Sequence, residues 1–202
     1  MPRAPITLLL FLCVSVLLAG CSSSTKAPNG RPLMKDGRYA SSYNAFVADP
    51  NYRHTRDVWY HDARISQAGT KNSKIVIHLK NQRGVLWVDD QVAMDFPVCT
   101  GRSTHETPRG RFTIIQKDED YRSRSYGSVF DVSGKCVNSD ATSSSPVPRG
   151  GKFIGAKMPL WMRIHGGIGL HVGTVYRDAN SHGCIRAVSY THLRAHETLS
   201  DL

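Results

Sequence analysis

The chain has 202 residues and carries 26 Lys and Arg against 16 Asp and Glu, which gives a formal net charge of +10. With 40% apolar residues it is long enough for one catalytic or binding domain with additional segments. The positive charge favours an anionic neighbourhood, but no run of Lys and Arg is interleaved with aromatic residues, which argues against a nucleic-acid-binding module.

The first twenty residues have the pattern of a secretory signal. Arg3 is followed by an apolar run over residues 6–18, which is shorter than the roughly 20 residues of a membrane-spanning helix. The run ends in LAGC, which resembles a bacterial lipobox and implies that residues 1–20 are removed and that Cys21 is lipidated. Acyl chains on Cys21 would hold the protein on a membrane. Serines at 22–24 favour the periplasmic face of the outer membrane of a diderm bacterium; the alternative is a plain secretory signal with a chance cysteine.

Two segments precede the main domain. Residues 21–42 are rich in Ser, Pro, Gly and Lys, which predicts a flexible tether. Residues 43–73 contain DVWYHDARISQAG, a stretch that could form a short amphipathic helix ended by Gly69. We expect residues 43–73 to pack on the main domain as an N-terminal extension.

From residue 74 the pattern changes to strands. KIVIHLK places Ile75 and Ile77 on one face, NQRG predicts a turn, and VLWVDD resumes the alternation, so the two runs predict a β-hairpin. QVAMDFPVCTG and GRFTIIQ predict two further strands. Helical periodicity is scarce, and Gly and Pro recur, so residues 74–187 are expected to form a mainly β domain, a β-sandwich or curved sheets with few short helices. His78, on a strand expected to lie inside the sheet, is interpreted as structural.

The five cysteines divide by position. Cys13 lies in the signal segment and Cys21 at the lipobox, which leaves Cys99, Cys136 and Cys184. In an oxidising compartment Cys99 and Cys136 could form a disulfide, or they could remain two small free thiols. Both alternatives stay open, because a disulfide depends on a Cα separation that the sequence does not show.

Three stretches follow one another in a characteristic order: FPVCTGRSTHETPRGRFTI, MPLWMRIHGGIGLHVG and SHGCIR. Together they resemble the L,D-transpeptidase catalytic domain, also called the YkuD-type domain, over roughly residues 74–186. The resemblance implies a mainly β domain in which a cysteine attacks peptidoglycan stem peptides, with no cofactor. The positions that match the active-site motifs of the family are His171, Ser181, His182, Gly183, Cys184 and Arg186.

Cys184 is the expected nucleophile. A thiol with a pKa of about 8.5 is only a few per cent ionised at neutral pH, so it needs a basic or positive neighbour. His171 is expected on a strand that turns back beside the Cys184 loop, where it would act as general base and then as proton donor to the leaving amine. Gly183 is expected to let the N–H groups of Gly183 and Cys184 point at the oxyanion. His182 is expected to orient the loop or to contact the substrate.

Three further residues have roles that the sequence leaves less defined. Arg186 offers a forked donor to a substrate carboxylate. Ser181 could hydrogen-bond within its turn or hold a substrate group. Trp161 could line a substrate groove, as the resemblance implies, or pack in the core.

The same residue types also suggest a metal site. His165 precedes His171 by six residues, so continuous strand alternation would place both on one face, and with His182 and Cys184 they form a set of zinc-type ligands. The set lacks a pair with the usual spacing of two to four residues, and zinc would quench the thiolate as a nucleophile. We therefore expect no metal.

The resemblance implies two-step acyl transfer. Cys184 would attack the carbonyl of the third stem residue and expel the terminal D-alanine, and the thioester would then pass to an amine. That amine could belong to another stem peptide or to a lysine of an envelope lipoprotein that becomes tethered to the wall. Water as acceptor would give a carboxypeptidase, or an amidase that releases such a tether. A wall-binding lipoprotein without turnover is the alternative from a different class.

Residues 188–202 depart from the pattern. Members of the family continue with an apolar residue, a helix and a closing strand, whereas AVSYTHLRAHETLSDL carries no strand signal of that length. VSYTHLRAHET also resembles translated sequencing-adapter DNA. We therefore interpret residues 188–202 as a non-native tail in place of a closing element, and we expect a lower stability than in a relative that has this element.

Overall fold

The computed structural model describes residues 42–188. The signal segment, the lipidation site at Cys21, all but the last residue of the tether and residues 189–202 of the tail lie outside the described residues. The predictions on these segments therefore stay predictions. Within residues 42–188 no helix is long and apolar enough to cross a membrane.

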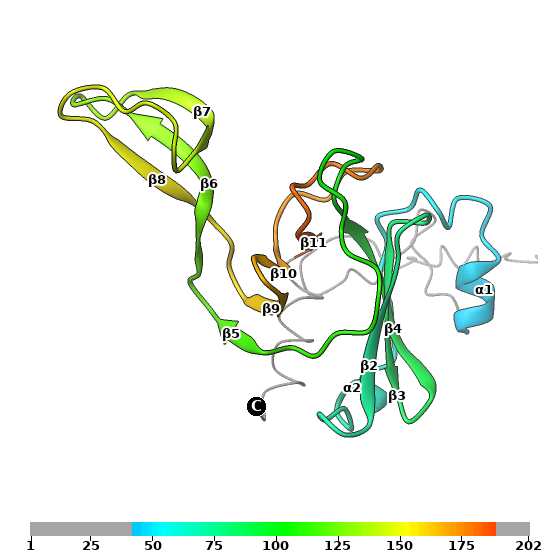
Figure 1. Ribbon diagram of the computed structural model, residues 1–202. Helices are drawn as coiled ribbons and strands as arrows, with labels where there is room; N and C mark the ends of the chain where they lie inside the picture. Colours follow the sequence, from blue (N-terminus) through cyan, green and yellow to red (C-terminus); the bar gives the residue numbers. More distant parts are fainter. Residues whose placement is uncertain (1–41, 189–202) are drawn as a thin grey trace, which may run out of the picture.

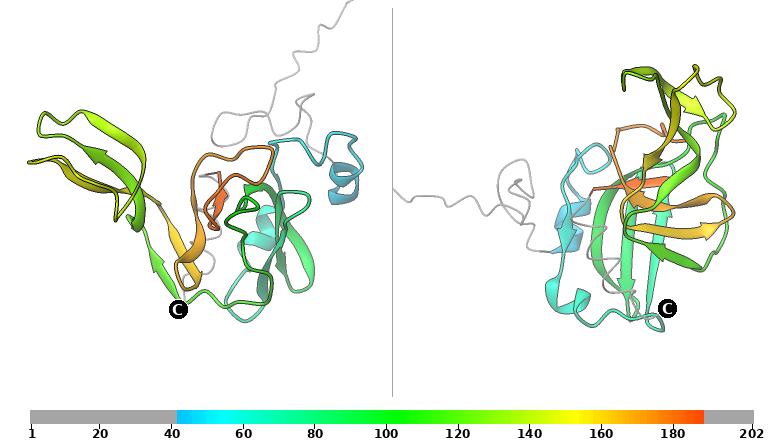
Figure 2. Two further views of the ribbon diagram at one scale, coloured as in Figure 1. Left: turned by 45° about the horizontal axis from the view of Figure 1, so that its top comes forward. Right: turned by 90° about the vertical axis from the view of Figure 1, so that its left-hand side faces the viewer.

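The described chain is mainly β, as the sequence predicts, and forms two sheets (Figure 1). The larger sheet has the order β2-β3-β4-β11-β10-β9-β5, with β1 paired to β4, and the smaller has the order β7-β6-β8. The smaller sheet projects to one side of the larger one (Figures 1 and 2). The elements are α1 (Tyr43–Val47), β1 (Trp59–Tyr60), α2 (Asp62–Ile65), β2 (Ser73–His78), β3 (Arg83–Val88), β4 (Gln91–Cys99), β5 (Gln116–Asp118), β6 (Arg122–Phe130), β7 (Cys136–Thr142), β8 (Lys152–Lys157), β9 (Trp161–His165), β10 (Ile168–Val172) and β11 (Ile185–Ala187).

The predicted β-hairpin is confirmed as β2 and β3, which pair antiparallel with Ile75 opposite Leu86. The next turn is the two-residue link between β3 and β4, where Asp89 and Asp90 have φ of 46° and 58°. Aspartate tolerates this left-handed conformation better than most residues. β2 lies at the edge of the sheet, so the expectation that His78 lies on an inner strand is wrong, and its side chain is exposed.

The stretch GRFTIIQ differs from its prediction. Residues 110–115 form no strand, and β5 begins only at Gln116. β5 pairs with β9 only from Trp161 to Arg163, although β9 continues to His165. A single backbone bond, from the Ile115 N–H to the Arg163 carbonyl at 2.9 Å, continues the contact. Alternation alone does not make a strand where the backbone pairing with the neighbouring strand stops.

The main core lies on one face of the larger sheet. Alternate residues of neighbouring strands supply it, as the two-residue period of a strand requires. The buried cluster consists of Val58, Ile65, Leu86, Val88, Ala93, Met94, Phe96, Val98, Met162, Leu170, Ile185 and Ala187.

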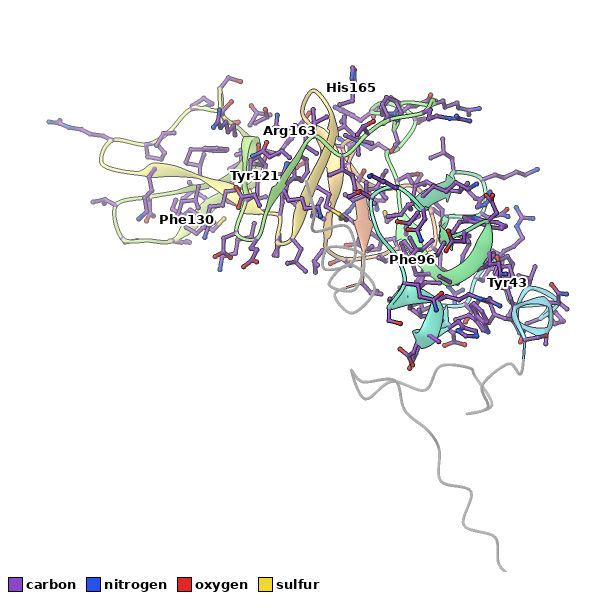
Figure 3. All side chains as sticks on the ribbon, turned by 90° about the horizontal axis from the view of Figure 1, so that it is seen from below. Tyr43, Phe96, Tyr121, Phe130, Arg163 and His165 are labelled. Carbon is purple, nitrogen blue, oxygen red and sulfur yellow. The ribbon has the colours of Figure 1, made fainter. Side chains whose placement is uncertain are left out.

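The junction between the two sheets is formed by aromatic and cationic side chains (Figure 3). The rings of Tyr121 and Trp161 stack with centroids 4.7 Å apart and planes at 14°. The Arg163 guanidinium lies 5.8 Å from the Tyr121 ring centroid and 5.9 Å from that of Trp161. Such cation–π contacts add to the apolar burial at the point where the smaller sheet leaves the body.

The N-terminal extension packs on the larger sheet, as expected, but not as one amphipathic helix. DVWYHDARISQAG divides into the short strand β1, which pairs with β4, and the four-residue helix α2. Trp59 lies opposite Asp95 in that pairing, and Ile65 of α2 is 1% exposed within the core. The free strand edge and the apolar cluster together therefore override the helical periodicity.

A buried ion pair of the larger sheet contacts the N-terminal extension. Arg83 of β3 and Asp95 of β4 are 1% and 0% exposed, and the Arg83 Nη2 and Asp95 Oδ1 atoms are 2.7 Å apart. The second carboxylate oxygen accepts hydrogen bonds from the hydroxyls of Tyr43 at 2.8 Å and Tyr52 at 2.7 Å. Burial and the bond to Asp95 raise the pKa of Tyr52 to about 12, so its hydroxyl remains a donor. The carboxylate is thus satisfied on both sides, which a buried charge requires.

The guanidinium holds the chain that follows α1. The Arg83 Nη1 donates to the Thr55 carbonyl at 3.0 Å, and the Nη2 donates to the Asp57 carbonyl at 3.1 Å. The same group lies over the rings of Phe46 and Tyr52, at 5.4 and 5.2 Å. One arginine therefore fixes both the helix and the loop of the extension.

Asp95→Asn should destabilise the protein by about 3–5 kcal/mol, because it leaves the Arg83 charge buried without a counter-charge. Tyr52→Phe removes one hydrogen bond and should cost about 1 kcal/mol. Urea unfolding of both variants measures the difference. A loss of stability in Asp95→Asn as small as that in Tyr52→Phe would contradict the structural role of the pair.

Candidate active site

Strand pairing brings the predicted site residues together. β10 and β11 are parallel, with His171 opposite Arg186, and the antiparallel pairing of β11 with β4 sets Arg186 opposite Cys99. Side chains that lie opposite each other point to the same face of a sheet. Cys184 directly precedes β11, two residues before Arg186, and so shares this face. The face is the one turned away from the main core, to which Leu170 and Ile185 point.

The Cys184 side chain on this face is partly buried, and its thiol is free. Its Sγ lies 3.6 Å from the Gly167 carbonyl oxygen. Burial raises the pKa of the thiol, while the Gly169 N–H and the Arg186 guanidinium oppose this shift only in part. The resting side chain is therefore a neutral thiol that needs a base in order to become a nucleophile.

His171 has the properties of that base. The ring is 7% exposed, and its Nδ1 lies 2.9 Å from the Val172 carbonyl oxygen. A carbonyl only accepts, so Nδ1 carries the proton and Nε2 keeps its lone pair. Burial lowers the pKa of His171 to about 4, and the nearby Arg186 charge adds to the effect. The imidazole is thus neutral at physiological pH and able to accept a proton.

The SHGC turn is closed by its own serine. The Ser181 hydroxyl donates to the Cys184 carbonyl at 2.5 Å and accepts from the Gly183 N–H at 3.1 Å. Gly183 has φ of +105°, and a Cβ there would lie 2.7 Å from Ile168 Cδ1, so the position requires glycine. The prediction that the Gly183 N–H points at the oxyanion is wrong for this state, because that donor is bonded to Ser181. Of its two expected roles, Ser181 takes the one within the turn.

The loop after β4 braces the turn from the other side. The Thr107 hydroxyl, on a residue 5% exposed, donates to the Gly183 carbonyl at 2.7 Å and accepts from the Gly101 N–H at 2.8 Å. The Ser181 N–H donates to the Thr100 carbonyl at 3.0 Å. Sequence reasoning gave Thr107 no role, although TPRG was among the stretches that carry the resemblance.

His182 lies in a small cluster of polar and aromatic side chains. The Arg102 Nη2 lies 2.8 Å from the His182 Nε2, and since arginine only donates, this nitrogen accepts. Its ring lies 4.9 Å from His105 and 4.5 Å from Tyr126, between centroids. Burial and the Arg102 charge lower the pKa of His182. These contacts fit the expected orienting role, and sequence reasoning missed Arg102, His105 and Tyr126 as its partners.

Trp161 does not line a groove. It is 0% exposed, stacked beneath Tyr121, and its ring centroid lies 6.2 Å from that of His171. The proposed substrate contact is therefore wrong, and the core-packing alternative is correct. The indole serves as a rigid wall behind the His171 ring.

Arg186 is engaged by its own chain through one of its nitrogens. Its Nη2 lies 3.6 Å from the Cys99 Sγ and donates to the Asn180 carbonyl, and its guanidinium lies 5.5 Å from the Tyr176 ring centroid. The buried Nε has no hydrogen-bond partner within residues 42–188, so the contact with a substrate carboxylate stays a prediction. In this structure Arg186 acts through its charge, which lowers the pKa of both His171 and Cys184.

The residues considered for a metal are separated. His165 ends β9, and His171 lies on β10, which runs back antiparallel after the turn at Gly166. The expectation that one continuous strand alternation places both histidines on the same face is therefore wrong. Across residues 42–188 no three His, Cys, Asp or Glu side chains gather where they could hold a metal ion. The disulfide alternative is also resolved: Cys99 is a buried free thiol and Cys136 an exposed one in the smaller sheet.

The low pKa of His171 predicts an acid-sensitive fold. The unfolded histidine binds its proton below about pH 6.5 and the folded one only near pH 4, so stability is full above 6.5 and falls as the pH drops toward 4. The loss over this window should reach about 3 kcal/mol. Urea unfolding at pH 7 and pH 4.5 measures it, with His171→Gln as control. An equal loss of stability in wild type and His171→Gln would refute the assignment.

The chain is similar to several proteins of known structure. The chain resembles solved structures of an L,D-transpeptidase (Yku) from Stackebrandtia nassauensis, with 20% identity, a TM-score of 0.46 and coverage of 68% of this chain and 58% of that one. An L,D-transpeptidase from Mycobacterium smegmatis is 19% identical, with a TM-score of 0.47 and coverage of 63% of this chain and 54% of that one. The chain thus spans little more than half the length of either. Curated proteins yield no match. The model of the L,D-transpeptidase catalytic domain, YkuD, matches residues 72–193, more than half of the sequence, and the chain belongs to this family.

Proposed function

We propose that the protein is a cysteine-dependent acyl transferase, an L,D-transpeptidase that acts on peptidoglycan stem peptides. The observation that carries the proposal is the placement of Cys184, directly before β11, and His171, on the adjacent parallel strand β10, within the matched family domain. A buried neutral imidazole and a partly buried thiol on one sheet face supply a base and a nucleophile.

The first half-reaction forms the acyl-enzyme. The Cys184 thiol gives its proton to His171 as its sulfur attacks the stem-peptide carbonyl, so a sulfur–carbon bond forms and an oxyanion develops. The oxyanion then collapses, the carbon–nitrogen bond breaks, and the imidazolium gives its proton to the leaving amine. Because both groups start neutral, no ion pair has to be desolvated before the substrate binds.

The oxyanion needs donors in the transition state. The Gly183 N–H is bonded to the Ser181 hydroxyl at 3.1 Å, so its participation requires this one hydrogen bond to open. The turn remains held by the Thr107 hydroxyl while that happens. We place this rearrangement in the acylation step.

The second half-reaction passes the thioester to an amine, in cell-wall cross-linking or in tethering of an envelope protein, and His171 deprotonates the incoming amine. Localisation belongs to the same proposal. The LAGC sequence that ends at Cys21 and the serines after it support a lipid-anchored protein on the periplasmic side of the outer membrane. Defined tetrapeptide muropeptides, with and without an added amine, identify the acceptor through the products.

Cys184→Ala should abolish acylation, because it removes the only atom that forms the thioester. Incubation with a carbapenem, which mimics the acyl donor, should add one covalent adduct to the wild-type protein and none to the variant, as measured by mass spectrometry. Cys136→Ala, at the exposed free thiol, is the matched control and should leave the adduct unchanged. A wild-type protein with neither adduct nor stem-peptide cleavage would remove the catalytic proposal.

Thr107→Val should slow acylation by about tenfold, because it unpairs the Gly183 carbonyl and the Gly101 N–H at a cost of about 1–3 kcal/mol. Thr107→Ser keeps the hydroxyl and should retain most of the rate. Single-turnover rates with the carbapenem measure the change, and the concentration for half-saturation should stay constant. A higher carbapenem concentration for half-saturation, with an unchanged limiting rate, would instead indicate a substrate-binding role.

A further inference from the structure

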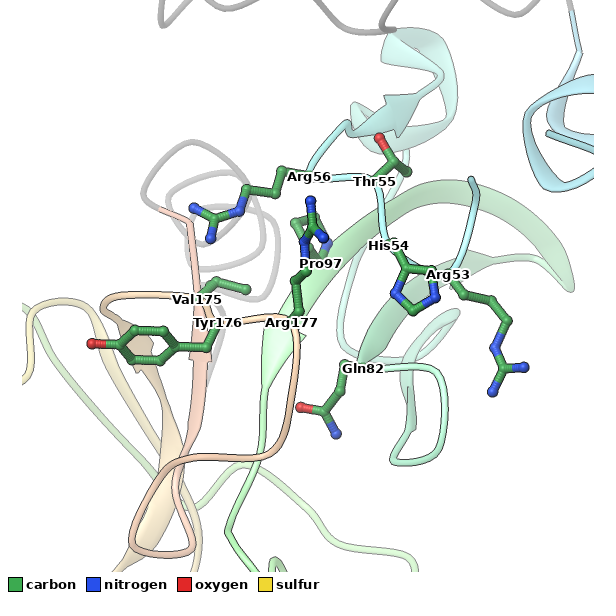
Figure 4. A pocket seen from close by; sticks show the side chains of 9 residues that line it. All are labelled: Arg53, His54, Thr55, Arg56, Gln82, Pro97, Val175, Tyr176 and Arg177. Atoms are coloured by element: carbon green, nitrogen blue, oxygen red, sulfur yellow. The ribbon is translucent and has the colours of Figure 1, made fainter. Parts of the chain in front are cut away.

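A small cationic pocket lies where the N-terminal extension meets the loop between β10 and β11 (Figure 4). Arg53 and Arg56 come from the extension, Arg177 and Tyr176 come from the loop, and Gln82 lies between them. The space inside the pocket is about 10 Å³, enough for a water molecule but not for a larger group. A larger anion would therefore be held at the surface by the exposed arginine side chains and not inside the pocket.

The three arginines of the pocket are exposed and uncompensated. The ion pairs within residues 42–188 are Lys74 with Asp90 and Arg83 with Asp95, and neither includes an arginine of the pocket. Guanidinium groups stay charged at all relevant pH values, so the pocket concentrates like charges that repel one another. An anion bound between the arginines would be attracted by each guanidinium and would offset their mutual repulsion.

The backbone that carries these cations is already fixed. The carbonyls on either side of Arg56, those of Thr55 and Asp57, accept hydrogen bonds from the buried Arg83. On the other wall, Val175 is 6% exposed and the Tyr176 ring lies beside the Arg186 guanidinium. Little backbone order has to be gained on binding, which lowers the entropic cost of association.

The floor of the pocket adds no competing group. The amide of Gln82 is already committed, because its Nε2 donates to the Leu79 carbonyl and the Thr100 hydroxyl and its Oε1 accepts from the Thr100 N–H. Recognition therefore falls to the arginines. Their forked donors match the oxygens of a phosphate, which carries more charge and more acceptors than a carboxylate.

We propose that the cationic pocket is a binding site for a phosphate group, presented either by a free phosphate or by a lipid headgroup. Arg56 from the extension and Arg177 from the loop supply the main contacts, whereas the Arg53 side chain points away from both (Figure 4). The site involves neither Cys184 nor His171, so its failure and the failure of the proposed function are distinguishable.

Calorimetric titration of the full chain with inorganic pyrophosphate tests the site. The variant Arg56→Gln/Arg177→Gln should bind at least tenfold more weakly than wild type. Lys135→Gln/Lys152→Gln removes the same charge from exposed residues of the smaller sheet and should change the affinity less than twofold. Carbapenem acylation should be unchanged in both variants, which also shows that they are folded.

Two outcomes would overturn the proposal: no binding by the wild-type protein, or equal weakening in both double variants, which would show a dependence on net charge alone. Should the arginine double variant fail to fold, Arg177→Gln alone carries the same test. Co-sedimentation with phosphatidylglycerol and phosphatidylcholine vesicles distinguishes the sources. Binding to the anionic vesicles that is lost in the arginine variant identifies a headgroup, and pyrophosphate binding without vesicle binding identifies a free phosphate.

Discussion

The parallel pairing of β10 with β11 is the constraint on which the rest of the site depends. β11 has only three residues, yet it lies between β4 and β10 and joins the two halves of the larger sheet. Ile185 and Ala187, 2% and 0% exposed, anchor it in the core. Because side chains alternate along a strand, this anchoring turns Arg186 and the preceding Cys184 to the opposite face, beside His171. A shift of one residue would bury the nucleophile.

The electrostatics of the site follow from that placement. His171 and Cys184 are both largely removed from solvent on this face, and each keeps its neutral form. The Arg186 charge lowers the pKa of both groups, which favours the thiolate but disfavours the imidazolium. Its contacts with the Cys99 thiol and the Asn180 carbonyl hold this charge on the same face of the sheet. The balance yields a resting pair without charge separation.

The sequence was sufficient for the fold class, the first hairpin and the segment that holds Cys184, because these depend on local alternation and on a short motif. It was insufficient wherever a distant strand decides the outcome. GRFTIIQ alternates like a strand but pairs with β9 only at its end, and Trp161 occupies the core because Tyr121 covers it. The Gly183 N–H and the Arg186 Nη2 bond to neighbours that only the folded chain supplies, and Thr107 becomes a brace for the same reason.

The sheet face that carries Cys184 also supports the N-terminal extension and the cationic pocket. Along β4, Asp95 holds the extension through Arg83, Pro97 lies in the floor of the cationic pocket, and Cys99 touches Arg186. Alternation places these three residues of β4 on the same side, so the extension, the pocket and the active site share one support. The loop that contributes Arg177 to the pocket also sets Tyr176 against Arg186. The loop between β10 and β11 thus contacts both the pocket and the Arg186 side chain, which follows Cys184 by two residues.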